Sequence, residues 1–202
     1  MAAVTVSRQL GSLGTQIARE VARRLGYRTV WREVINEAAR RAGAPEVALA
    51  MIDDLGLLGV ELRPEASRAY EEAIQEVMED LASEGDAVII GRAGQVILAD
   101  RPDVLHVRVI APLPLRVERI ASMHKISTAA ARARVEQSDR TRRDYLRTCY
   151  GVDWDDPQLY DLVLDTEELT LDGGADLVCH AMARRVERND GGTPEKGEPG
   201  LG

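Results

Sequence analysis

The sequence contains few of the aromatic residues that often fill a protein core. Of its 202 residues, 3% are aromatic and none is Phe, whereas 45% are hydrophobic. Leu, Val, Ile and Ala must therefore build the core, and the length suits a single domain with a sizeable interior. The only cysteines, Cys149 and Cys179, form neither a metal-binding spacing nor a disulfide framework. This usage is typical of a reduced, cytosolic protein.

Long apolar runs and a basic charge balance are absent as well. No stretch approaches the roughly 20 apolar residues of a membrane span, and no signal-peptide pattern is visible, so we expect a cytoplasmic protein without a membrane partner. The formal net charge of −8 argues against general binding to nucleic acid. Basic residues nevertheless gather in residues 116–147, which indicates either a small anionic ligand or a solvated helix face.

Short apolar runs alternate with helical patterns along the chain, which predicts a parallel α/β sheet. Glycines bound the continuous apolar run GDAVIIG, as expected for a central strand. The expected strands cover residues 2–7, 28–30, 85–91, 103–110 and 160–166. The expected helices cover residues 15–25, a segment ending near 43, a piece starting at Pro45, and residues 64–83, 127–147 and 172–187.

Residues 4–26, VTVSRQLGSLGTQIAREVARRLG, combine a β-branched strand, a glycine-containing turn and an amphipathic helix. That order is typical of a phosphate-binding loop, in which backbone N–H groups and a helix N-terminus hold phosphate oxygens. Compared with the pattern G-x-x-x-x-G-K-[ST], however, Arg8 replaces the first glycine, Leu13 the second and Gly14 the lysine. Thr15 keeps the hydroxyl that binds Mg²⁺ in such loops.

Arg8 is the natural substitute for the missing lysine, because a guanidinium at a strand end can bind two phosphate oxygens at once. Gly11 and Gly14 still allow a tight turn, and with Ser12 and Thr15 they form the candidate site for the donor phosphates. The alternative is a strand–turn–helix unit without a phosphate ligand, which many α/β proteins contain.

Further segments resemble, in the same order, elements of bacterial cytidylate kinases. VIIGRAG (88–94) is similar to their strand and Gly-Arg element, and VLHVRVIAPLPLRVERI (104–120) to the next strand and its arginine-bearing helix. DRTRRDYLR (139–147) resembles their lid-side R-x-x-x-D-x-x-R element, and YDLVLDTEELTLD (160–172) their last strand and Asp-Thr turn. The start, VSRQLGSLGTQIA, is most similar to the cytidylate kinase-like subgroup, which begins with Ser-Arg-Gln and lacks the loop lysine.

The resemblance covers about residues 4–185 and implies a P-loop kinase fold, with a five-stranded parallel sheet flanked by helices. It also implies ATP- and Mg²⁺-dependent phosphorylation of CMP or a related nucleoside monophosphate. The kinase-like domain would span residues 1–188, with a helical insertion at 44–84 and a lid region at 122–150. The insertion is either a monophosphate-binding arm or a dimer surface. Residues 189–202, rich in Gly and Pro, are expected to form a disordered tail.

The resemblance assigns roles to basic residues outside the loop. Arg92, after a central strand, would bind the acceptor monophosphate, and Arg140 and Arg147 would stabilise the transferring phosphate. On a helix, Arg140, Asp144 and Arg147 share one face, with Arg143 beside them. Asp144 would hold an arginine or contact the nucleotide. The alternative interpretation is an ordinary ladder of intrahelical salt bridges.

The remaining polar and aromatic residues are expected to serve structure. Arg116 and Arg119 fit a solvated helix face, with contact to a phosphate as the alternative, and His106 lies inside a strand. Trp31 and Trp154 are expected to pack instead of stacking on a base.

Two functions remain open from the sequence, both with small-molecule nucleotides as partners. One is a cytidylate kinase-like phosphotransferase, with Arg8 in place of the lysine. The other is a catalytically degenerate module that binds a nucleotide or phosphate without turnover. Ala93 stands where an Asp usually follows the Gly-Arg arginine, so the acceptor base is left open. An oligomeric scaffold is a third hypothesis.

Overall fold

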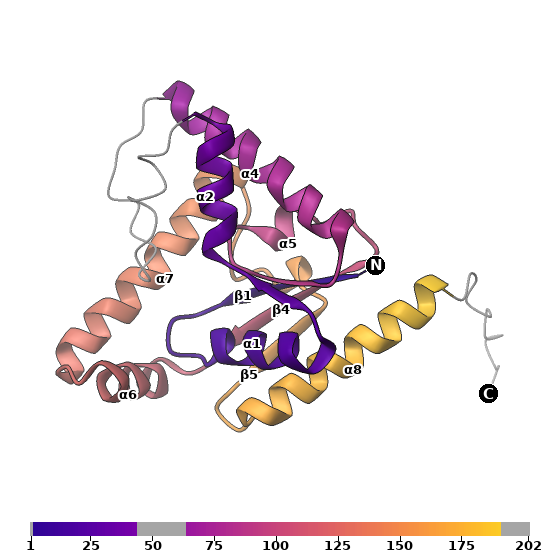
Figure 1. The fold of residues 1–202 in the computed structure, drawn as a ribbon. Coiled ribbons are helices and arrows are strands. Elements are labelled where there is room, and N and C mark those ends of the chain that lie inside the picture. Colours follow the sequence, from indigo (N-terminus) through magenta and orange to yellow (C-terminus); the bar gives the residue numbers. More distant parts are fainter. Residues whose placement is uncertain (1, 44–63, 191–202) are drawn as a thin grey trace, which may run out of the picture.

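Five parallel strands form the centre of the protein (Figure 1). The computed structural model describes residues 2–43 and 64–190. The sheet has the order β2-β3-β1-β4-β5, which confirms the predicted five-stranded parallel sheet. Its strands are β1 (Ala3–Arg8), β2 (Arg28–Val30), β3 (Ala87–Ile90), β4 (Val104–Ile110) and β5 (Leu162–Asp165).

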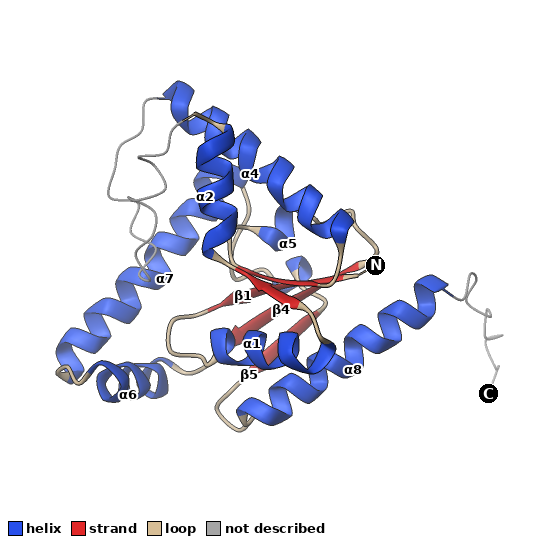
Figure 2. Ribbon diagram, in the orientation of Figure 1, coloured by secondary structure: helices blue, strands red, loops and turns tan. Residues whose placement is uncertain are grey.

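Helices cover both faces of this sheet (Figure 2). The first and last helices pack on one face, and the helices between β2 and β4 pack on the other. Two further helices lie beyond the end of the sheet toward which β1 runs. The helices are α1 (Gly14–Leu25), α2 (Arg32–Arg41), α4 (Pro64–Glu84), α5 (Gly94–Ile97), α6 (Leu113–His124), α7 (Thr128–Tyr150) and α8 (Leu171–Asp190), with a 3₁₀ turn at Pro157–Leu159.

The central strand β1 is buried on both of its faces. Val4 and Val6 pack in the cluster that contains α1 and α8, whereas Ala3 packs with α2 and α4. Because successive side chains of a strand point to opposite faces, the apolar residues of β1 pack against the helices on both faces of the sheet. The sheet therefore has a dry interior without any contribution from Phe.

Several element boundaries differ from those expected from the sequence. α7 continues to Tyr150, and Gly151, with φ of 68°, ends it. α8 extends to Asp190, so the first residues of the expected tail are helical. Asn189 donates a hydrogen bond from Nδ2 to Pro102 O (3.0 Å), which ties this last turn to the loop before β4. The helical piece expected from Pro45 and residues 191–202 lie outside the described residues.

None of the helices in the described ranges is long and apolar enough to cross a membrane.

His106, on β4, is held inside the sheet as a neutral side chain. Its Nε2 lies 3.2 Å from Leu98 O, which can only accept, so Nε2 carries the proton. Its Nδ1 then accepts from Thr5 Oγ1 at 2.7 Å. Burial lowers the pKa of His106 below its usual value. These contacts confirm a structural role for the residue.

The lowered pKa of His106 predicts a loss of stability in mild acid. Below pH 6.5 the unfolded chain binds a proton at this imidazole while the folded chain does not. The free energy of unfolding therefore decreases as the pH is lowered. We expect His106→Gln to reduce the slope of this free energy between about pH 7.5 and 5.5, measured by urea unfolding. An unchanged slope would contradict the assignment.

Candidate functional site

The turns that follow β1 and β3 meet at the carboxyl edge of the sheet. These strands are neighbours, with Val6 opposite Ile90. The chain leaves β1 toward α1 on one face and leaves β3 toward α5 on the other. A crevice between adjacent strands whose connections diverge is the usual ligand site of an open α/β sheet. In Figure 1 this edge faces α6 and α7.

The turn between β1 and α1 has its carbonyl groups bound by surrounding side chains. Leu10 O accepts from Arg116 Nη1 (3.4 Å), Gly11 O from Arg119 Nη1 (3.3 Å) and Ser12 O from Thr166 Oγ1 (3.0 Å). In a trans peptide the C=O and the following N–H point in opposite directions. The N–H groups of Gly11 and Leu13 therefore face away from these side chains, as an anion-binding turn requires.

The start of α1 adds further N–H groups to this surface. Leu13 precedes the helix with φ of 64°, and the first helical bond runs from Ile17 N to Leu13 O (2.9 Å). The N–H groups of Gly14, Thr15 and Gln16 consequently have no acceptor within the helix. Together with the positive end of the helix dipole, they make this end of α1 suitable for phosphate.

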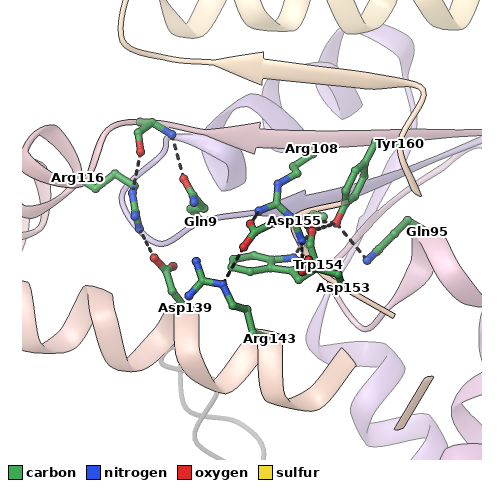
Figure 3. A network of polar contacts seen from close by, with 12 residues as sticks. Gln9, Gln95, Arg108, Arg116, Asp139, Arg143, Asp153, Trp154, Asp155 and Tyr160 are labelled. Atoms are coloured by element: carbon green, nitrogen blue, oxygen red, sulfur yellow. Dashed lines mark hydrogen bonds and ion pairs between the residues drawn. The ribbon is translucent and has the colours of Figure 1, made fainter. Parts of the chain in front are cut away.

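Ser12 shapes the turn from within. Its hydroxyl donates to Gln9 O (2.9 Å), and its side chain is fully buried. Gln9 Oε1 in turn accepts from Ala111 N (3.1 Å), which ties the turn to the end of β4 (Figure 3). The sequence placed Ser12 among the phosphate-binding residues, but the structure directs its hydroxyl into the turn.

Arg8 occupies the space beside Gly14. A Cβ on Gly14 would overlap the Cβ of Arg8 and lie 3.0 Å from that of Val109, so no lysine fits at this position. The guanidinium of Arg8 extends toward β3, where its Nη1 would lie 2.5 Å from a Cβ on Gly91. Its Cζ is 5.7 Å from the ring centroid of Trp31. Arg8 thus places its charge beside the turn that follows β3, at the carboxyl edge of the sheet.

Arg92 lies in a strained turn at the same edge. Gly91, Arg92 and Ala93 have successive φ values of 77°, 59° and 56°. The left-handed conformation costs a non-glycine residue roughly 1–2 kcal/mol, and such strain is concentrated at functional sites. Ala93 is buried against Leu146 of α7 and Trp154, so packing maintains the turn.

Helix α7 turns Arg142, and not Arg140 or Arg147, toward the sheet. The buried residues of α7 are Ala131, Val135, Ser138, Asp139 and Leu146. Arg142 falls on the same face and is partly buried, whereas Arg140 is exposed. Desolvation lowers the pKa of Arg142 to about 10, with Arg92 and Arg116 lowering it further and Asp139 opposing them. Arg142 is therefore within electrostatic reach of Arg92, a relation that the sequence analysis missed.

Asp144 and Arg147 pair with each other on the exposed face of α7. Arg147 Nη2 is 2.9 Å from Asp144 Oδ1, and the Arg147 side chain is 77% exposed. The predicted alignment of Arg140, Asp144 and Arg147 is thus correct as helical geometry. In this structure, however, it does not bring those side chains to Arg8 and Arg92. Apolar Val135 and Leu146 decide which face turns inward, and their spacing was the signal available in the sequence.

Arg143 joins a network that holds α7 to the sheet (Figure 3). Its Nε is 2.8 Å from Asp155 Oδ2, and the other carboxylate oxygen of Asp155 pairs with Arg108, which is buried on β4. The Arg108 guanidinium lies 4.3 Å from the ring of Trp154, whose Nε1 donates to Ser7 Oγ (2.9 Å). Trp154 packs in the core, as expected.

The expectation for Arg116 and Arg119 was wrong. Arg116 is 4% exposed and Arg119 is partly buried, with Nη1 and Nη2 of Arg119 donating to Thr166 Oγ1 (2.9 Å) and O (2.8 Å). The first turn of α6 lies against the β1–α1 turn, so these side chains reach backbone carbonyls instead of water. The aliphatic part of a long arginine side chain can be buried while its guanidinium donates hydrogen bonds. Composition alone does not reveal this arrangement.

Thr15 is the described residue best suited to contribute to a magnesium site. Within residues 2–43 and 64–190, no three His, Cys, Asp or Glu side chains are grouped to hold a metal ion. The hydroxyl-bearing Thr15 lies in the first turn of α1 and is partly exposed. Mg²⁺ commonly takes most of its oxygen ligands from substrate phosphates and water, so this donor set fits an ion that arrives with a nucleotide.

A five-stranded parallel sheet flanked by helices, with a glycine-containing turn between its central strand and the first helix, is the architecture of P-loop kinase folds. A gluconokinase from Sinorhizobium meliloti superposes with a TM-score of 0.55 at 14% identity, over 96% of this chain and 98% of that one. An uncharacterised protein from Eubacterium ventriosum gives 0.72 at 16% identity, over 91% and 99%. These similarities confirm the fold.

Residues 3–168 match the cytidylate kinase-like family, and the chain belongs to that family. The cytidylate kinase of Methanopyrus kandleri is 29% identical over 196 residues, which cover 93% of this chain and 96% of the relative. Family and fold together support a nucleotide kinase.

The contact between Gly14 and Arg8 predicts that a side chain at position 14 destabilises the fold. We expect Gly14→Ala to lower the free energy of unfolding by about 1–3 kcal/mol, because it forces the Arg8 stem out of place. Urea unfolding measures the change. Gly173→Ala, near the start of α8 with its nearest atom 3.3 Å away, is the control and should stay within about 1 kcal/mol. Equal effects would contradict the steric argument.

Proposed function

We propose that this protein is an ATP-dependent nucleoside monophosphate kinase that phosphorylates CMP or a related monophosphate. The observation that supports this most directly is the turn between β1 and α1. Its carbonyl groups are bound on one side, and its N–H groups are presented on the other, beside Arg8. Phosphoryl transfer depends on such positioning and on positive charge around the transferring group.

The N–H groups of Gly11, Leu13, Gly14 and Thr15 hold the donor phosphates in this proposal. Thr15 binds the Mg²⁺ ion, which neutralises charge on the β- and γ-phosphates when it is bound. The family membership and the fit of Thr15 to an oxygen-coordinated ion support this assignment.

Arg8 and Arg92 bind the acceptor phosphate and the transferring group at the carboxyl ends of β1 and β3. Arg142, which is within electrostatic reach of Arg92, joins them. Arg140 and Arg147 act only after their side chains turn toward the bound substrates, when Asp144 releases Arg147. A rearrangement of this kind completes a kinase site.

The alternative function is a module that binds nucleotide without turnover. Gly14 favours it, because the position that carries the lysine in a standard P-loop has no room for one. The two functions differ in whether Arg8 supplies the charge that reaches the transferring phosphate.

The direct test combines purified full-length protein, ATP, Mg²⁺ and a panel of nucleoside monophosphates. We expect formation of a nucleoside diphosphate, fastest with CMP or a close relative, and a fall in kcat on the order of 10²–10³ in Arg8→Ala. Arg184→Ala is the control, since that side chain is 72% exposed on α8 and pairs only with Glu187 among the described residues. Tight nucleotide binding with no diphosphate from any acceptor would establish the binding module instead.

We expect a substitution of Arg142 to change the activity of the protein but not its stability. Burial lowers the pKa of Arg142, and its Nη1 donates to Ser138 Oγ on the same helix, so the cost of burying the charge offsets this contact. We therefore expect Arg142→Met to change the free energy of unfolding by less than about 1 kcal/mol. The same variant should reduce kcat/KM by about tenfold or more, because it removes a cation within electrostatic reach of Arg92. Urea unfolding and steady-state kinetics measure the two effects. A less stable variant with unchanged kinetics would make Arg142 a structural residue.

A further inference from the structure

Arg116 fills the space behind the β1–α1 turn and uses its guanidinium in several directions. Its Nε donates to Ala111 O (2.9 Å) and its Nη1 to Leu10 O (3.4 Å), and Nη1 also lies 2.9 Å from Asp139 Oδ2 (Figure 3). One buried side chain thus connects the end of β4, the turn after β1 and helix α7.

The turn also presses on the backbone of Arg116. Gly11 has φ of +83°, and a Cβ there would lie 2.8 Å from Arg116 O. Only a glycine fits this contact, so the position of the first turn of α6 determines the position of the turn after β1. A displaced Arg116 would therefore move the N–H groups proposed to hold phosphate.

Asp139 is the buried carboxylate that keeps Arg116 in place. Its side chain is 7% exposed, and its Oδ1 is buried with no hydrogen-bond partner within the described residues. A buried carboxylate oxygen without a partner is costly to a fold. Arg142, on the same face of α7, interacts electrostatically with Asp139 as well. Asp139 therefore lies between an arginine behind the turn and an arginine near Arg92.

We propose that Asp139 is a positioning residue of the phosphate site, which acts through Arg116 to fix the turn between β1 and α1 relative to α7. This inference rests on the proposed function, because it assigns the turn to the donor phosphates. Asp139 itself contacts no substrate. Its effect is transmitted by the bonds from Arg116 to Leu10 O and Ala111 O.

A positioning role and a purely electrostatic role predict opposite results for Asp139→Asn. Removing a negative charge near a phosphate site would strengthen anion binding if charge alone mattered. If Asp139 positions the turn, the loss of the ion pair loosens the turn and weakens binding. A misplacement of about 1 Å in a catalytic site can reduce activity on the order of 10²-fold.

The test compares Asp139→Asn with the full-length parent protein in three measurements. We expect faster amide hydrogen exchange at Gln9 and Ser12, whose N–H groups donate to Val109 O (3.1 Å) and Gln9 O (3.3 Å). We also expect weaker binding of inorganic tripolyphosphate and a fall in kcat/KM for ATP of about 10- to 100-fold. Glu136→Gln is the matched control, because Glu136 pairs with Arg132 at 3.2 Å on the exposed face of the same helix. It should leave all three quantities within about twofold of the parent.

Asp139→Asn leaves the buried charge of Arg116 without its partner, and such a charge can prevent folding. A double variant covers that case. Replacing both members of a buried ion pair by apolar residues is often tolerated, so Arg116→Met/Asp139→Leu should remain folded. It lacks the donors to Leu10 O and Ala111 O, and we expect the same faster exchange and lower kcat/KM.

Parent-like exchange and kcat/KM in either folded variant, or tighter tripolyphosphate binding by Asp139→Asn, would overturn the proposal. If the parent protein forms no diphosphate at all, the proposed function fails. Amide exchange at Gln9 and Ser12 and tripolyphosphate binding would still decide the role of Asp139.

Discussion

The candidate site depends on the direction of the peptide groups in the turn between β1 and α1. A short turn can present either its oxygens or its N–H groups to a ligand, and only the N–H groups attract phosphate. Here Arg116, Arg119 and Thr166 bind the oxygens, so the N–H groups are left for the opposite side. The elements behind the turn, α6 and the segment after β5, therefore fix the direction of its peptide groups.

The absence of a lysine at position 14 has a steric reason in the fold. The stem of Arg8 fills the space at Gly14, and the two residues exclude a larger side chain there. The positive charge is thereby moved from the first turn of α1 to the carboxyl edge of the sheet, near Gly91. A cation there is adjacent to the strained turn that carries Arg92. Arg8 and Arg92 are brought together because β1 and β3 are hydrogen-bonded neighbours.

Helix α7 illustrates how far a sequence pattern can be taken. The pattern predicted a charged helix after residue 127 and the common face of Arg140, Asp144 and Arg147, and both are correct as local geometry. Which face turns inward depends on Val135 and Leu146 and on the segment after α7, where Asp155 connects Arg143 to buried Arg108. The spacing of Val135 and Leu146 indicates the buried face of the helix on which Arg142 lies. It does not indicate that Arg92 is within electrostatic reach of that face, because the contacts that place α7 join residues far apart in the chain.

The sequence by itself determined the alternation of strands and helices, the parallel sheet, the glycine-containing turn before α1 and the family, because these follow from local patterns and motif order. The tertiary structure alone decided that Arg116 and Arg119 lie behind that turn, that Ser12 points into it, that Asp139 pairs with Arg116, and that Arg142 is partly buried. The physical reason is that an arginine or aspartate has the same local preferences in water and in a buried ion pair. Its partner, and hence its role, is fixed only when distant elements pack together.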